Sequence, residues 1–257
     1  MLAEKWNVET SNFSDIDTVA SGFSSAATRY TQHNKVQKIT SRQLLTGVEL
    51  KGNVLDLGAG PGTELAVEQG NVFCVDIALG MLQQLSKQYS RYHAINADAH
   101  ALPLLTNSIG TIVSNLALQW CGDFDSAIAE SARVLQKNGA MHVSLVAENS
   151  LPQLSNLGFM VNQFRSFSQY KKAFLNGSWD VLEATSSEMT VYFSDLKTLL
   201  YSIKGVGAST ASNGLPSQLT LRGRKDWLNL LTETEKLMTD KGIPLTYHIV
   251  QIRARKS

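Results

Sequence analysis

The chain has 257 residues, of which 43% are hydrophobic and 18% are charged, and its formal net charge is +1. This apolar content is ample for a large core, so we expect one domain with insertions rather than two independent domains. The near-neutral charge gives no reason to expect nucleic acid or a membrane surface as a partner.

The cysteines and the apolar segments indicate where the protein works. Cys74 and Cys121 do not form the pattern of a disulfide framework, and reduced thiols are typical of the cytoplasm. We find no signal peptide, no apolar stretch of membrane-spanning length and no metal-binding motif. We therefore expect a soluble, cytoplasmic protein that uses no metal.

The first periodic pattern predicts helices over residues 16–48. Phe23, Ala27 and Tyr30 fall on one helical face. The simplest interpretation is a helical cover over one edge of a sheet. Residues 1–14 are polar and carry no pattern, so we expect a loose terminus there.

A short apolar run followed by alternating glycines is the centre of the sequence. Val54–Leu57 contains an acid, Asp56, and leads into the segment 58–62, which reads G-A-G-P-G. This pattern predicts a buried strand and a tight turn, and Thr63–Leu65 has the composition of a helix start. Ligands of open α/β sheets bind outside the carboxyl ends of the strands, so we expect a ligand at this turn.

The spacing of these glycines distinguishes two kinds of ligand. A dinucleotide-binding turn reads G-x-G-x-x-G, whereas the third glycine here comes one residue earlier. With Asp56 two residues before the first glycine, the turn resembles the D-x-G-x-G-x-G turn of class I S-adenosylmethionine (SAM)-dependent methyltransferases. The alternative is another nucleotide-binding turn, or a glycine turn with a purely structural role.

Two further acids end the next two predicted strands. Asp76 ends the run 71–76 and is placed to accept hydrogen bonds from ribose hydroxyls, as an acid in an NAD enzyme would be. Asp98 and Ala99 follow the run 92–97 and match the place where class I methyltransferases hold adenine. Asp98 could instead cap the following turn. Three carboxylates at successive strand ends favour SAM over NAD.

The second half of the chain continues the alternation of strands and helices. Gly110–Asn115 predicts the fourth strand. The other predicted elements are a helix at about 78–89, a helix at 125–135, a strand at 140–146, a lid insertion at 150–185, a strand at about 187–193, a helix at 195–203 and a strand at 242–250.

Three motifs resemble one family in particular. They are F-x-x-A-A-x-x-Y at 23–30 with V-Q at 36–37, S-N-L-A-L-Q-W-C-x-D at 114–123, and P-L-T-Y at 244–247. Together they resemble the malonyl-acyl-carrier-protein O-methyltransferases of biotin synthesis (the BioC family), over residues 23 to about 254. The chain departs from that family in a shorter lid and in an altered loop at 212–217.

The resemblance implies an α/β fold of the Rossmann-like, class I methyltransferase type. Its seven-stranded, mostly parallel sheet has helices on both faces, an N-terminal helical cover and a lid insertion after strand five. We expect a single domain over 1–257, divided into the helical cover (15–48), a SAM-binding core (49–149), the lid insertion (150–185) and the C-terminal half of the sheet (186–257).

The resemblance also implies a reaction and its residues. The family transfers the methyl group of SAM to the free carboxylate of a malonyl thioester, on acyl carrier protein or on coenzyme A, and so starts pimeloyl and biotin synthesis. The implied cofactor-binding residues are Tyr30, Gln37, Gly58, Ala59, Gly60, Asp76, Ile77, Met81, Asp98, Ala99, Asn115 and Leu116. Tyr30 is also the candidate that positions the carboxylate, Gln119 is expected with Trp120 to line the methyl-transfer pocket, and Trp120, Lys204 and Arg222 are candidate substrate residues. Core packing for Trp120, and solvated surface charge for the two basic residues, are the alternatives.

Three other functions remain open at this point. The first is a SAM-dependent methyltransferase of another small acceptor, such as a quinone precursor or a free carboxylic acid. The second is a non-enzymatic or regulatory protein on the same fold. A nicotinamide-dependent dehydrogenase is the third.

Overall fold

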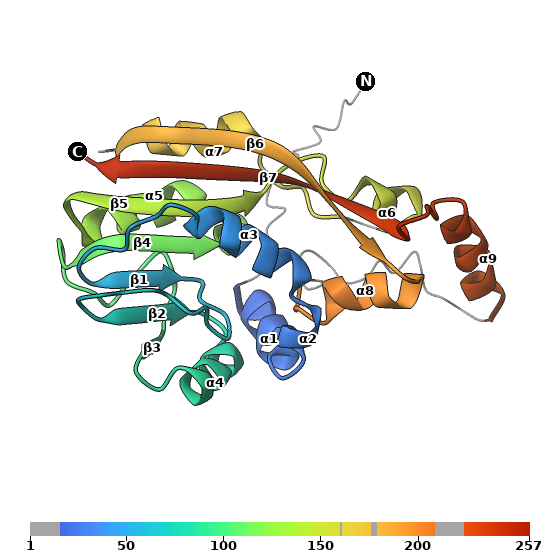
Figure 1. Ribbon diagram of the computed structural model, residues 1–257, viewed down its shortest axis with the longest axis horizontal. Helices are drawn as coiled ribbons and strands as arrows, with labels where there is room; N and C mark the ends of the chain where they lie inside the picture. Colours follow the sequence, from blue (N-terminus) through green and yellow to red (C-terminus); the bar gives the residue numbers. More distant parts are fainter. Residues whose placement is uncertain (1–15, 160, 176–178, 209–223) are drawn as a thin grey trace, which may run out of the picture.

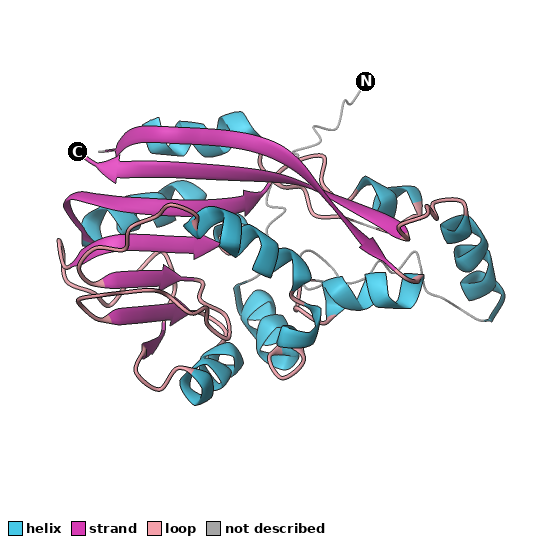
Figure 2. Ribbon diagram, viewed as in Figure 1, coloured by secondary structure: helices cyan, strands magenta, loops and turns pink. Residues whose placement is uncertain are grey.

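The computed structural model describes residues 16–159, 161–175, 179–208 and 224–257, and a seven-stranded sheet lies at its centre (Figures 1 and 2). The helices are α1 (Ile16–Ala26), α2 (Tyr30–His33), α3 (Lys35–Leu45), α4 (Leu79–Gln88), the 3₁₀ helix η1 (Leu118–Trp120), α5 (Phe124–Val134), α6 (Pro152–Asn156), α7 (Phe167–Leu175), α8 (Leu196–Lys204) and α9 (Arg224–Glu235). The strands are β1 (Val54–Leu57), β2 (Val72–Asp76), β3 (His93–Asn96), β4 (Ile109–Asn115), β5 (Leu135–Val146), β6 (Trp179–Phe193) and β7 (Ile243–Lys256).

The strands lie in the order β3-β2-β1-β4-β5-β7-β6. β1 pairs in parallel with β2 and β4, and the parallel pairing continues outward to β3 and β5. β7 is antiparallel to both β5 and β6, so among the described strands it alone runs in the opposite direction. The predicted mostly parallel sheet is confirmed.

Helices cover both faces of the sheet, as expected. α3 contacts β4 and β5 on one face, while α5 contacts β5 from the other face and α7 packs against α5, β6 and β7 (Figure 1). Because both faces are covered, all four residues of β1 are buried. Phe124, Tyr170 and Phe174 from α5 and α7 are almost fully buried in the same cluster as the apolar residues of β4 and β5.

The connection from β1 to β2 corrects one prediction. We expected a helix that begins at Thr63–Leu65, but no helix forms between the glycine turn and β2. A parallel crossover needs a dozen or more residues to hold a helix, and the turn itself uses the first part of the segment 58–71. The apolar side chain of Leu65 is buried, and its N–H donates to Tyr92 Oη at 2.9 Å.

The C-terminal half of the sheet is longer than predicted. β6 begins at Trp179, inside the segment that we assigned to the lid, instead of at about 187. α6 and α7 supply the helical part of that segment. Residues 249–255 of β7 pair with both β5 and β6, whereas 243–248 pair with β6 alone among the described strands. This outer ribbon extends past the rest of the sheet, toward α6 and α8 (Figure 2).

Several sequence predictions fall where the structure gives no description. They concern the terminus at 1–14, the loop at 212–217 and the candidate substrate residue Arg222. No helix among the described residues is long and apolar enough to cross a membrane.

Candidate active site

The glycine turn after β1 brings the backbone against the loop that follows β4. Gly58 and Gly60 have φ values of +73° and +57°, a region that side chains rarely adopt. A Cβ atom on Gly58 would overlap the Cβ of Ala117. The turn therefore needs glycine at this position for its conformation and also for its close approach to the neighbouring loop.

Gly58→Ala tests this close approach. We expect the substitution to lower the free energy of unfolding by about 1–3 kcal/mol and to weaken SAM binding, because it adds both overlap and left-handed strain. Ala117→Gly in the same chain removes the overlap and should restore part of the loss. Urea unfolding and calorimetry of both variants provide the measurement, and no recovery in the double variant would contradict this account.

Asp76, at the end of β2, fixes the glycine turn from the neighbouring strand. Its Oδ2 accepts the N–H of Gly60 at 2.8 Å, and its Oδ1 accepts the N–H of Ala78 at 2.8 Å. Burial raises the pKa of the Asp76 carboxyl, although these backbone hydrogen bonds oppose the shift. The carboxylate is thus held rigidly at the carboxyl end of the sheet.

Asp98, after β3, is held by a residue that sequence reasoning missed. Its Oδ1 accepts the backbone N–H of His100 at 2.9 Å and lies 2.6 Å from His100 Nδ1. His100 Nε2 lies 2.9 Å from the carbonyl oxygen of Asp123. The imidazole thereby joins the turn after β3 to the start of α5. The only signal for this contact in the sequence is a histidine two positions after an aspartate.

Asn115 ends β4, and Leu116 directly after it has an unusual backbone conformation. Asn115 Nδ2 donates to the carbonyl oxygen of Gln37 at 3.0 Å, which joins β4 to α3. Leu116 has a φ of +52°, and its carbonyl oxygen accepts a hydrogen bond from Gln119 Nε2 at 2.7 Å. Strained backbone of this kind persists only where its surroundings hold it in place, and it gathers at functional sites.

The three strand ends surround a cavity of about 630 Å³, here called the glycine-turn cavity. The predicted cofactor residues that line it are Tyr30, Gly58, Gly60, Asp76, Ile77, Met81, Asp98, Ala99, Asn115 and Leu116. The cavity combines apolar side chains with carboxylates that can accept hydrogen bonds from hydroxyl and amino groups. This combination fits an adenosine ligand, and the volume suits a ligand of that size. Ala59 and Gln37 are not among its lining residues, so their cofactor roles stay predictions.

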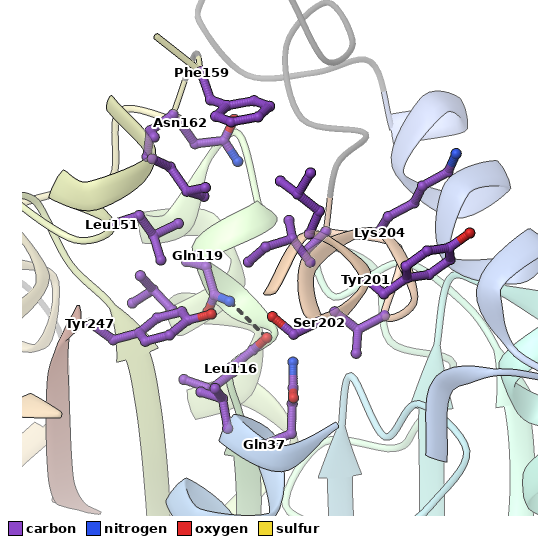
Figure 3. A pocket seen from close by; sticks show the side chains of 18 of the residues that line it. Gln37, Leu116, Gln119, Leu151, Phe159, Asn162, Tyr201, Ser202, Lys204 and Tyr247 are labelled. Atoms are coloured by element: carbon purple, nitrogen blue, oxygen red, sulfur yellow. Dashed lines mark hydrogen bonds between the residues drawn. The ribbon is translucent and has the colours of Figure 1, made fainter. Parts of the chain in front are cut away.

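A second cavity of about 480 Å³ has Tyr247 of the β6–β7 ribbon in its lining and is here called the ribbon cavity (Figure 3). Most of its lining is apolar and comes from α3, α6, α8, α9, β7 and the segment before α7. Its buried polar atoms include the Oε1 atoms of Gln37 and Gln119, neither of which has a hydrogen-bond partner among the described residues. This second cavity is suited to an acceptor molecule.

Four side chains line both cavities and mark the place where they meet. They are Phe23, Tyr30, Leu116 and Trp120. The Trp120 ring makes edge contacts with the rings of Phe23 at 5.5 Å and Phe164 at 6.2 Å between centroids. Trp120 is therefore a wall between two cavities and is not enclosed in the core of the sheet.

The candidate basic residues do not gather at this meeting place. Lys204 lines the ribbon cavity from the last turn of α8, but its side chain is exposed and its amino group turns away from Gln119 and Tyr247 (Figure 3). Arg222 lies outside the described residues. Tyr247 and Phe23 line the site although sequence reasoning assigned them no role, and the motifs around both residues were the available signal.

The hydroxyl of Tyr30 lies in an electrostatic environment that keeps its proton. Burial, followed by the nearby carboxylates of Asp76 and Asp56, raises the pKa of Tyr30 well above its ordinary value. The Tyr30 ring also lies near the backbone of Gly60. At neutral pH Tyr30 is thus a hydrogen-bond donor at the point where the two cavities meet.

Asp56 gives the protein a measurable pH dependence. Burial, and then the charge of Asp76, raise the pKa of Asp56 from 3.8 to about 7. A carboxyl with a raised folded-state pKa stabilises the fold at low pH, and this contribution is lost as the pH rises through about 7. Asp56→Asn stays neutral, so at about pH 8.5 we expect it to raise the free energy of unfolding by about 2–4 kcal/mol.

Urea unfolding of the cofactor-free protein measures this effect. Below about pH 3 the wild-type carboxyl is protonated in both states, so the difference between the two proteins should vanish. A difference of equal size at both pH values would show that the substitution acts through packing.

Comparison with known proteins agrees with this arrangement. Residues 55–143 match the family model described as a methyltransferase domain. The chain is 32% identical to the malonyl-[acyl-carrier protein] O-methyltransferase of Salmonella typhimurium, over 90% of this chain and 94% of that protein. The protein of the same name from a Marinomonas species is 31% identical, over 93% of each chain.

A solved structure supports the fold independently of these sequences. A SAM-dependent methyltransferase from Thermotoga maritima superposes with a TM-score of 0.57 at 16% identity, over 92% of this chain and 99% of that chain. At this identity the likeness concerns the fold alone. It confirms the predicted Rossmann-like methyltransferase fold.

Proposed function

The chain belongs to the family of malonyl-[acyl-carrier protein] O-methyltransferases, and from this premise we propose that it methylates the free carboxylate of a malonyl thioester on acyl carrier protein. The chain is a SAM-dependent methyltransferase. The product is the malonyl methyl ester with which pimeloyl and biotin synthesis begins.

The observation that carries the proposal is the junction of the two cavities. A methyl transfer in a single displacement needs donor and acceptor in line, each bound on its own side of the reacting carbon. The glycine-turn cavity and the ribbon cavity share Phe23, Tyr30, Leu116 and Trp120. A donor in the first cavity and an acceptor in the second can therefore meet without either crossing the protein.

The glycine-turn cavity provides recognition for the cofactor. Asp76 would accept hydrogen bonds from the ribose hydroxyls, and Asp98 would accept one from the amino group of adenine. Ile77 and Met81 line the same cavity beside these carboxylates and offer apolar contact to the adenine ring. When bound, SAM supplies an electrophilic methyl group on a sulfonium sulfur.

The acceptor chemistry requires no general base. A carboxylic acid with a pKa of about 4 is already ionised at neutral pH, so nothing needs to remove a proton. What the chain must supply is alignment and the exclusion of water, which together can be worth about 7–11 kcal/mol. Tyr30 would donate to one carboxylate oxygen, and the rings of Phe23 and Trp120 would keep water from the other side.

The partner and the compartment follow from the same proposal. Acyl carrier protein is the expected carrier of the malonyl group, with malonyl-coenzyme A as the alternative thioester. Cys74 and Cys121 are both free thiols, which supports the reducing cytoplasm as the location.

Methyl transfer from labelled SAM tests the choice of acceptor. Malonyl-acyl carrier protein, malonyl-coenzyme A and free malonate are offered separately at equal concentration. We expect the carrier protein to be the best acceptor and free malonate to be the poorest. Equal use of malonyl-coenzyme A would show that the enzyme does not recognise the carrier protein itself. Label in none of the three would contradict the proposed function.

One observation favours a second candidate function. The ribbon cavity is lined mostly by apolar side chains, and the amino group of Lys204 turns away from it. Such a cavity also suits an aromatic acceptor, such as a quinone precursor, or a free carboxylic acid with an apolar chain. Transfer of label to such a compound, with none to any malonyl thioester, would establish this alternative.

A further inference from the structure

Gln119 is buried in the wall of the ribbon cavity, and one of its two amide heavy atoms, the oxygen, makes no hydrogen bond. It lies in η1, directly after β4, and only 4% of the residue is exposed. Its Nε2 donates to the carbonyl oxygen of Leu116 at 2.7 Å, drawn as the dashed line in Figure 3. Its Oε1 is buried and has no partner among the described residues.

The hydrogen bond to Leu116 fixes which end of the amide is free. If the amide were turned over, Oε1 would face the carbonyl oxygen of Leu116, and two acceptors would oppose each other. The free atom is therefore an acceptor. A buried acceptor without a partner costs about 1–3 kcal/mol, so its position calls for a donor from the ligand.

Among the described residues no donor, the neighbouring Tyr247 hydroxyl included, makes a hydrogen bond to this oxygen. The hydroxyl of Ser202 already donates to the carbonyl oxygen of Leu199 at 2.6 Å. Gln37 Oε1 is a second unpartnered acceptor, and the amino group of Lys204 turns away.

The malonyl group itself cannot satisfy Gln119 either. At neutral pH its carboxylate and its thioester carbonyl are both acceptors. The first N–H donor along a carrier-protein thioester is the amide of the arm, two methylenes beyond the sulfur. A carboxylate placed near Tyr30 would leave the thioester and this amide inside the ribbon cavity.

We propose that Gln119 Oε1 accepts a hydrogen bond from this amide N–H and so selects an amide-bearing thioester arm. The inference rests on the proposed function and deepens it. Gln119 becomes a specificity-determining residue for the part of the acceptor that does not react. Its Nε2 meanwhile holds Leu116 in its left-handed conformation beside the reacting groups.

A pair of matched acceptors isolates this hydrogen bond. Malonyl carrier protein is prepared with the natural arm, and also with an arm in which an ester oxygen replaces the amide N–H nearest the sulfur. Wild type should use the amide arm with a kcat/KM about 5–30-fold higher, because only the amide donates. Gln119→Met keeps the length but loses the acceptor, so this ratio should fall to about one.

Gln37→Met serves as the matched control, since it removes the other unpartnered acceptor. It should keep the ratio of wild type, and loss of the ratio in this variant instead of in Gln119→Met would overturn the assignment. Calorimetry with SAM verifies that each variant binds its cofactor. If Gln119→Met does not fold, the wild-type ratio still decides, because equal use of the two arms would overturn the inference.

The experiment also separates the two claims. Transfer to both arms at equal rates refutes the role of Gln119 and leaves the proposed function intact. No transfer to the natural malonyl carrier protein refutes the proposed function itself.

Discussion

Asp76→Ala is expected to weaken SAM binding by about 100-fold or more, because the substitution removes the carboxylate that we propose accepts two charge-assisted hydrogen bonds from the ribose, each worth about 1.5–3 kcal/mol. It also removes the acceptor for the N–H groups of Gly60 and Ala78, which hold the glycine turn in place. Calorimetric titration with SAM measures the loss directly.

Asp76→Asn is the matched control for this prediction. The amide keeps one oxygen of the same size but loses the charge and one acceptor, so its loss of affinity should be smaller than that of Asp76→Ala. An unchanged affinity of Asp76→Ala for SAM would show that this carboxylate does not bind the ribose. The cofactor would then have to lie elsewhere in the glycine-turn cavity.

Tyr30→Phe is expected to lower kcat/KM for the malonyl acceptor by about 10–100-fold, because it removes the hydroxyl that we propose donates a hydrogen bond to the acceptor carboxylate where the cavities meet. SAM affinity should change less than about threefold, since the ring and its packing stay. Steady-state kinetics with both substrates separates these two effects.

Tyr201→Phe provides the control for the loss of a tyrosine hydroxyl. Tyr201 lies on the rim of the ribbon cavity, 39% exposed and stacked on His33, so its hydroxyl should matter little to catalysis. A Tyr30→Phe enzyme that keeps the wild-type kcat/KM would leave the carboxylate without its proposed donor.

Much of the glycine-turn cavity could be predicted because it depends on local patterns. Asp76 and Asp98 each follow a strand with an apolar pattern, and parallel strands bring their carboxyl ends to one edge of the sheet. In a parallel sheet in which these strands are neighbours, the two acids must lie close together at that edge. The same reasoning placed Asn115 at the end of β4, where it lines the cavity.

The wrong prediction at Thr63–Leu65 has a physical cause. The residues after the glycine turn include good helix formers, but the chain must reach the start of β2 within a few residues. Gly70, with a φ of +105°, makes the last turn before β2 tightly against the backbone of Gly52. Geometry of the connection outweighed local helix propensity.

Only part of the ribbon cavity could be predicted, because its walls are distant in the sequence. The motifs indicated Gln37, Gln119 and Trp120 as site residues, but not that they line a second cavity. Gln37, Gln119 and Tyr247 come from α3, η1 and β7, and only the folded sheet brings them together. The unpaired Oε1 of Gln119 has no signal in a sequence, since glutamine is most often a solvated surface residue. The link between His100 and Asp98 likewise depends on the shape of one turn.

The central claim is that a malonyl carboxylate is methylated where the two cavities meet. Its most direct test offers labelled SAM with malonyl-acyl carrier protein and, in parallel, with acetyl-acyl carrier protein, which has no free carboxylate. We predict a base-labile methyl ester on the malonyl form and no label on the acetyl form. Equal labelling of the two forms, or a label that resists base, would contradict the account.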